Sequence, residues 1–112
     1  MAYRSRTKVG VGILRFEGDL SVGEMVKMKN RLTRLLNKNH KHLLFDLRYA
    51  KNVELAGLGM LVDRLRSIRA QKGDIKLCNL RPEVKNALHM IGVNGLIESF
   101  PTEEEAIRSF AA

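Results

Sequence analysis

The chain has 112 residues, 45% of them hydrophobic, which fits one globular domain with its own core and excludes a disordered chain. It contains one cysteine, no apolar run of the roughly 18 residues that span a bilayer, and no signal-peptide pattern at its N-terminus, so we expect a cytoplasmic protein without an internal disulfide. The net charge of +8 leaves two interpretations open, namely solubility or an anionic partner.

The first part of the chain predicts a strand hairpin followed by a helix. Tyr3–Lys8 is expected to form an edge strand, and Val11–Phe16 alternates residue types as a half-buried strand does. Ser21 and Glu24 have the spacing of a capping box, which predicts a helix over Val22–Asn37. The apolar stripe of that helix is Met25, Met28, Leu32, Leu35 and Leu36.

The rest of the chain alternates strands with helices. The run Leu43-Leu44-Phe45 is continuous and apolar, which is typical of a strand buried on both faces. The predicted elements are a strand over His42–Leu47, a helix over Leu58–Lys72, a strand around Ile75–Leu77, a helix over Pro82–Met90, a strand over Leu96–Phe100 and a helix from Thr102 to Phe110. The order β-β-α-β-α-β-α-β-α predicts an α/β fold over residues 1–112, with a mostly parallel sheet and an antiparallel N-terminal hairpin.

Residue clusters that carry catalysis are missing from the sequence. His40 and His42 have no cysteine or carboxylate cluster beside them, and Cys78 lies in a predicted strand without an adjacent base. We therefore expect no enzyme, no metal and no cofactor. The pair Gly57 and Gly59 leaves open a weak anion or nucleotide site made by backbone N–H groups, or close packing of a loop against a helix.

One segment resembles a known family. Asp46-Leu47 ends the predicted buried strand, and after six residues comes Glu54-Leu55-Ala56-Gly57-Leu58-Gly59. This arrangement resembles the STAS family, the anti-sigma factor antagonist domain shared with sulfate transporters. In that family a strand ending in Asp-Leu precedes Asp-Ser-Ser-Gly-Leu-Gly or its Thr variant. Weaker similarities to the family occur, in the family's order, at residues 16–20, 81–84, 91–93 and 101–107.

The resemblance implies a bacterial regulator that binds a protein. Antagonists of this family bind an anti-sigma factor, often a serine kinase, which phosphorylates the first serine of the motif and so ends the complex. A phosphate adds about −1.5 to −2 charges. Here Leu55 replaces that serine and Ala56 the next hydroxyl, so the resemblance implies binding without phosphorylation control. The partner-binding residues carried over from the family are Asp19, Leu20, Ser21, Glu54, Leu55, Ala56, Gly57, Leu58 and Gly59.

Several alternatives stay open from the sequence. Leu55 is either an exposed anchor for a partner or a core residue beneath the helix, and Ala56 is expected to allow close packing. A basic stripe on the first helix is either a solvated face or a surface for an acidic partner; it consists of Lys27, Arg31, Arg34 and Lys38. The chain could also be a docking subunit of a signalling scaffold or a lipid-transport ATPase complex. The charge would suit a nucleic-acid or anionic-surface binder, although the sequence offers no supporting motif.

Overall fold

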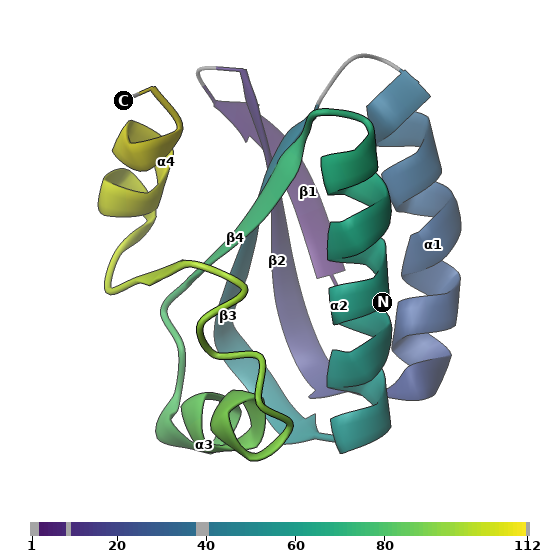
Figure 1. The fold of residues 1–112 in the computed structure, drawn as a ribbon, viewed down its shortest axis with the longest axis vertical. Helices are drawn as coiled ribbons and strands as arrows, with labels where there is room; N and C mark the ends of the chain where they lie inside the picture. The colour runs from purple at the N-terminus through teal and green to yellow at the C-terminus, as the bar shows by residue number, and fades with distance from the viewer. Residues whose placement is uncertain (1–2, 9, 38–40, 112) are drawn as a thin grey trace.

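The computed structural model describes residues 3–8, 10–37 and 41–111. Their strands form one five-stranded sheet in the order β1-β2-β3-β4-β5, in which β1 is antiparallel to β2 and strands β2 to β5 run parallel (Figure 1). The strands are β1 (Tyr3–Lys8), β2 (Val11–Leu20), β3 (His42–Val53), β4 (Asp74–Cys78) and β5 (Ser99–Phe100). The helices are α1 (Val22–Asn37), α2 (Leu55–Ala70), α3 (Pro82–Met90) and α4 (Glu103–Ala111). The predicted element order and the mixed sheet are confirmed.

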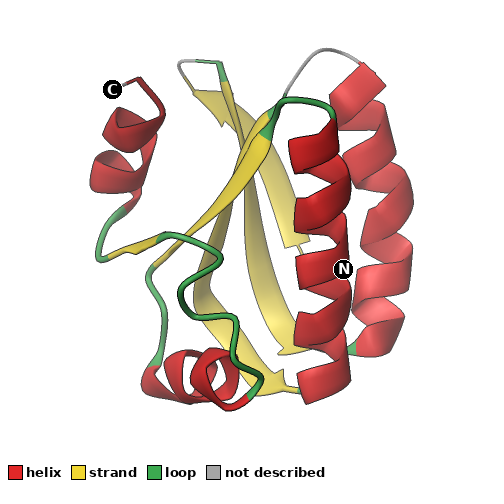
Figure 2. Ribbon diagram, viewed as in Figure 1, coloured by secondary structure: helices red, strands yellow, loops and turns green. Residues whose placement is uncertain are grey.

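Helices cover both faces of the sheet. Helices α1 and α2 lie side by side on one face, α4 lies on the other, and α3 packs at one end (Figures 1 and 2). In β3, Leu43 and Phe45 enter the core under α1 and α2, whereas Leu44 enters the smaller core under α4. Because neighbouring side chains of a strand point to opposite faces, the continuous apolar run of β3 is buried throughout, as expected.

Strand β3 is longer than the sequence analysis predicts. It continues six residues beyond Leu47 to Val53, because its pairing with β2 also continues and joins Tyr49 to Glu17 and Val53 to Leu20. The pairing register shifts twice along this stretch. The predicted end of the strand at Leu47 is therefore wrong, since the backbone partners that extend it are supplied by a distant segment.

Helix α2 begins at Leu55, three residues before the predicted start. Glu54 has an extended backbone and its carbonyl accepts the first helical hydrogen bond, from Leu58 N–H at 3.1 Å. Leu55, which the prediction placed before the helix, thus lies in its first turn. The last strand is shorter than predicted and begins at Ser99, because Leu96 closes a turn by donating its N–H to the carbonyl of Val93.

The predicted cap of the first helix is confirmed, and the last helix has a similar cap. The hydroxyl of Ser21 accepts a hydrogen bond from Glu24 N–H at 3.2 Å, and that of Thr102 accepts one from Glu105 N–H at 3.2 Å. Each bond satisfies one of the free N–H groups in a first helical turn. Among the described residues, none of the helices combines the length and hydropathy needed to cross a bilayer.

Candidate functional site

The candidate site lies where the connection between β2 and α1 meets the start of α2. Glu54 N–H donates to the carbonyl of Leu20 at 3.0 Å, and the side-chain amide of Asn52 donates to the carboxylate of Asp19 at 2.9 Å. These bonds join segments more than thirty residues apart in the sequence. The structure thus brings together the two segments in which the partner-binding residues were predicted.

Gly57 allows these two segments to pack closely. A Cβ atom on Gly57 would lie 2.8 Å from the carbonyl oxygen of Leu20 and 3.1 Å from the carbonyl carbon of Ser21. Such distances are shorter than van der Waals contact, so any side chain at this position would push the backbones apart. A Cβ on Gly59 would meet nothing within 4 Å. Gly57 therefore has the packing role that the sequence analysis left as one of two options.

Leu55 lies at the surface. Its exposed fraction is 44%, and its neighbours Glu54 and Ala56 are exposed as well. The interpretation of Leu55 as a core residue is therefore wrong, because the core under α2 begins only at Gly57 and Leu58. The expectation of close packing at Ala56 is also not met, since that residue is exposed and Gly57 makes the close contact instead.

The other predicted partner-binding residues divide by burial. Leu20, Gly57 and Leu58 are buried and can support the surface only from beneath, whereas Asp19 is exposed and Ser21 and Gly59 are partly exposed. The hydroxyl of Ser21 is already engaged as the cap of α1. Asn52, which fixes the position of Asp19, was not identified from the sequence, because nothing local in the sequence predicts a side-chain pairing between β2 and β3.

The sequence profile of one family matches nearly the whole chain. The match to the STAS domain covers residues 2–106. The chain belongs to the STAS domain family. A relative from Paenibacillus polymyxa, an anti-sigma F factor antagonist, is 25% identical over 100 residues, which are 88% of this chain and 85% of that protein.

Solved STAS structures share this fold. A candidate anti-sigma factor antagonist from Thermotoga maritima has a TM-score of 0.89 at 20% identity, over 98% of this chain and 95% of that one. The Bacillus cell fate determinant SpoIIAA in its phosphorylated form has a TM-score of 0.75 at 18% identity, over 97% of this chain and 99% of that one. At these identities the likeness concerns the fold.

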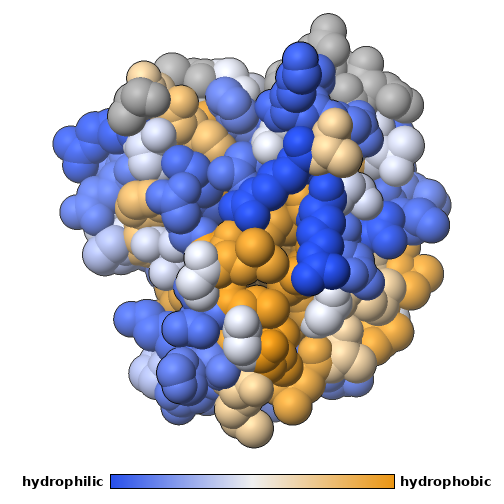
Figure 3. All heavy atoms as spheres, in the orientation of Figure 1, coloured by the Kyte–Doolittle hydropathy of each residue, from blue (hydrophilic) through white to orange (hydrophobic). Residues whose placement is uncertain are grey.

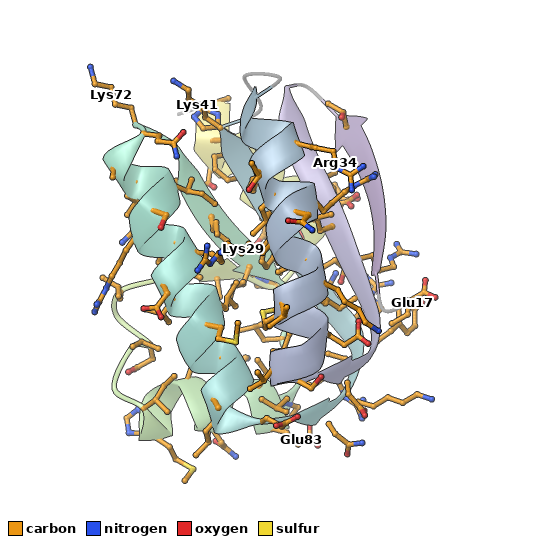
Figure 4. The ribbon with its side chains drawn as sticks, turned by 90° about the vertical axis from the view of Figure 1, so that its right-hand side faces the viewer. Glu17, Lys29, Arg34, Lys41, Lys72 and Glu83 are labelled. Carbon is orange, nitrogen blue, oxygen red and sulfur yellow. The ribbon has the colours of Figure 1, made fainter. Side chains whose placement is uncertain are left out.

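The predicted basic stripe lies on α1. Lys27 and Arg34 are exposed and Arg31 is half-buried, while Lys38 lies outside the described residues. Lys27 Nζ is 3.7 Å from the carboxylate of Glu24, and Arg34 projects away from α2 (Figure 4). The stripe thus belongs to α1 and the STAS motif to the start of the neighbouring helix α2.

Two features bear on metal binding and thiol reactivity in the part of the chain that the structure describes. Among the described residues, no three His, Cys, Asp or Glu side chains lie close enough to hold a metal ion. Cys78 is fully buried, and burial, together with the nearby carboxylates of Asp46 and Glu103, raises the pKa of its thiol to about 12. Because a thiol reacts as its thiolate, this environment keeps Cys78 unreactive at neutral pH, as the sequence analysis expected.

Exposed apolar side chains extend beyond the motif. Figure 3 shows apolar surface between α2 and the segment that follows α3. Among the side chains that the structure describes, the large exposed hydrophobic ones are Val26, Tyr49, Leu55, Met90 and Leu96. The guanidinium of Arg69 on α2 donates to the carbonyl of Leu96 at 2.8 Å and so fastens that segment to the far end of α2 from Leu55.

Proposed function

We propose that this chain acts in the cytoplasm as a single STAS domain, residues 1–112, that binds an anti-sigma factor or a related regulatory protein. Its relatives include anti-sigma factor antagonists, which are regulators rather than enzymes. The proposed contact surface is the first turn of α2 with the adjoining connection between β2 and α1. Its exposed members are Asp19, Glu54, Leu55 and Ala56.

The exposure of Leu55 is the observation that carries this proposal. A leucine at the surface gains free energy when a partner covers it, at roughly 25 cal/mol for each Å² of apolar area removed from water. The bonds from Glu54 N–H and Asn52 hold the turn in place before binding, so little ordering is needed when a partner docks. Carboxylates on Asp19 and Glu54 flank the leucine and suit cations on the partner.

The absence of phosphorylation control is part of the proposal. SpoIIAA is known in both an unphosphorylated and a phosphorylated form. A phosphate at an interface weakens binding when no cation matches it, because its charges must be desolvated. Leu55 and Ala56 have no hydroxyl that could accept a phosphoryl group. Binding through this turn would therefore persist while a serine-kinase partner is active.

The first test restores the missing hydroxyl. Anti-sigma factors of the source organism are purified, and their affinities for the wild-type chain and for Leu55→Ser are measured by calorimetry with and without ATP. With a partner that is a serine kinase, we expect the wild type to bind equally well in both conditions. The Leu55→Ser variant should gain one phosphoryl group by mass and then lose its affinity.

A matched pair of variants tests the contact surface itself. Leu55→Glu places a charge in the proposed interface and should weaken binding by at least tenfold, since burying an unpaired carboxylate costs several kcal/mol. Leu96→Glu makes the same change at a residue of similar exposure, 37%, beside the opposite end of α2 and should leave affinity unchanged. Equal losses in both variants, or none in either, would contradict the proposed surface. Binding only to subunits of a transporter or scaffold would favour the docking-subunit alternative.

A further inference from the structure

A pocket of about 450 Å³ lies on the sheet beside the candidate site, since two of its residues, Gly18 and Lys51, directly precede Asp19 and Asn52. It is lined by Arg15, Glu17, Gly18, Tyr49 and Lys51 from the neighbouring strands β2 and β3. A pocket of this volume falls in the range that holds a small ligand or one unit of a polymer. Tyr49 has an exposed fraction of 47%, so an aromatic ring stands at the surface in a pocket that Arg15 and Lys51 also line.

Buried groups fix the wall of this pocket. The carboxylate of Asp46 is only 1% exposed and accepts a hydrogen bond from Arg15 Nε at 3.3 Å. Asp46 also accepts bonds from the backbone N–H of Arg48 at 3.0 Å and from the side-chain amide of Asn79 at 3.1 Å. Arg15 is thereby held with its guanidinium carbon 5.5 Å from the centre of the Tyr49 ring. The cation and the aromatic ring are positioned before any ligand arrives.

The local sheet geometry opens the pocket to solvent. The register between β2 and β3 shifts between Arg15 and Glu17 and again between Gly18 and Leu20, and such irregularities redirect side chains near binding sites. A Cβ atom on Gly18 would meet nothing within 4 Å. The core under α4 includes Val11 and Ile13 of β2, so α4 covers the other end of this strand. Figure 4 shows Glu17 projecting away from α1 and α2.

The two strands that line the pocket and the neighbouring edge strand β1 are rich in cationic residues. Strands β1, β2 and β3 contain six Lys and Arg residues, and their three carboxylates include the buried Asp46. The backbone register pairs Arg15 with Arg4 and Ile13 with Arg6 of the edge strand β1. The edge strand that pairs with β2 thus has three cationic residues in its sequence, a composition that suits an extended polyanion better than an isolated anion.

We propose that this face of the sheet binds single-stranded nucleic acid, with one base stacked at Tyr49 and a flanking phosphate near Lys51. Proteins that bind single strands combine a basic track with aromatic rings on which bases stack, and arginine adds cation–π attraction. The carboxylate of Glu17 could accept a hydrogen bond from an exocyclic amine of a base. The sequence offered no motif in support of a nucleic-acid binder, whereas the structure places an exposed aromatic residue, Tyr49, in the pocket. The proposed activity uses residues other than those proposed for docking at Leu55, although Gly18 and Lys51 adjoin Asp19 and Asn52 of that site.

The test measures binding of a fluorescein-labelled single strand of about 12 nucleotides, a length within the site sizes of such proteins, by anisotropy. Affinity of the full-length chain should fall steeply between about 50 and 200 mM salt. Tyr49→Leu should weaken binding roughly 5- to 150-fold, whereas Tyr49→Phe, which keeps the ring, should stay near the wild type. Lys51→Gln should reduce the slope of log affinity against log salt by about 0.7 if Lys51 contacts one phosphate.

Lys72→Asn is the matched control, since it also removes one positive charge, at a turn far from the pocket (Figure 4). The backbone φ of Lys72 is 65°, a conformation that asparagine tolerates. It should leave both affinity and salt slope unchanged, and circular dichroism checks that each variant is folded. Absence of binding at low salt would overturn the proposal. Equal losses in Lys51→Gln and Lys72→Asn, with Tyr49→Leu unaffected, would also overturn it, as would equally effective competition by polyglutamate, because charge alone would then explain the binding.

Discussion

Replacing Gly57 by alanine tests whether the close approach of α2 to the β2–α1 connection holds the candidate site together. Alanine favours a helix interior over glycine by about 1 kcal/mol, so propensity alone predicts a stabilised protein. The new Cβ atom, however, would lie 2.8 Å from the Leu20 carbonyl oxygen and 3.2 Å from the Ser21 Cα. Both contacts are with backbone atoms, which cannot rotate aside, and overpacking of this kind costs about 1–3 kcal/mol. The net expectation is a loss of about 1 kcal/mol.

Gly59→Ala provides the control within the same helix. Gly59 lies two residues further along α2, where an added Cβ meets nothing within 4 Å. Only the propensity gain should remain, so this variant should be more stable than the wild type by about 1 kcal/mol. The free energies of unfolding of the two variants are compared by urea denaturation and should differ by about 2 kcal/mol, with similar denaturant slopes.

The same pair of variants separates stability from docking. Because Gly57→Ala must shift the turn that carries Asp19 and Leu55, it should also weaken binding of the partner, while Gly59→Ala should not. If Gly57→Ala proved as stable as Gly59→Ala, the close backbone approach would not constrain the site and the reasoning from Gly57 would fail. If Gly57→Ala lost stability but bound the partner as tightly as the wild type, the docking surface would have to lie elsewhere.

Two further predictions concern a cap and a thiol. Ser21→Ala should lower the free energy of unfolding by about 1 kcal/mol, because Glu24 N–H loses its acceptor. A change no larger than that of an alanine substitution at an exposed site without a cap would argue against this role of Ser21. The Cys78 thiol should react with a disulfide reagent at pH 8 only after unfolding. Its pKa is raised from 9.0 to about 12 in the folded state, so its stabilising contribution is complete below pH 9 and is lost as the pH rises towards 12. The difference in unfolding free energy between wild type and Cys78→Ala should therefore shrink by about 1.4 kcal/mol per pH unit in that range, and a constant difference would contradict the shift.

The order of strands and helices could be predicted from the sequence because the patterns that specify it are local. The alternation in Val11–Phe16, the helical stripe from Met25 to Leu32 and the capping spacing of Ser21 and Glu24 each extend over a few residues. Element ends were less predictable where they depend on a partner strand. Strand β3 continues to Val53 because β2 pairs with it, and no residue near Leu47 signals that pairing.

The sequence by itself determined the α/β architecture, the STAS motif and the absence of a hydroxyl at Leu55 and Ala56. Only the tertiary structure decided that Leu55 is exposed and that the backbone of Gly57 packs closely against that of Leu20. It also placed Arg15 and Tyr49 together beside Asp46. These features are contacts between segments far apart in the chain, and their distances and burial depend on the packing of elements against one another, which a local pattern of residues does not specify.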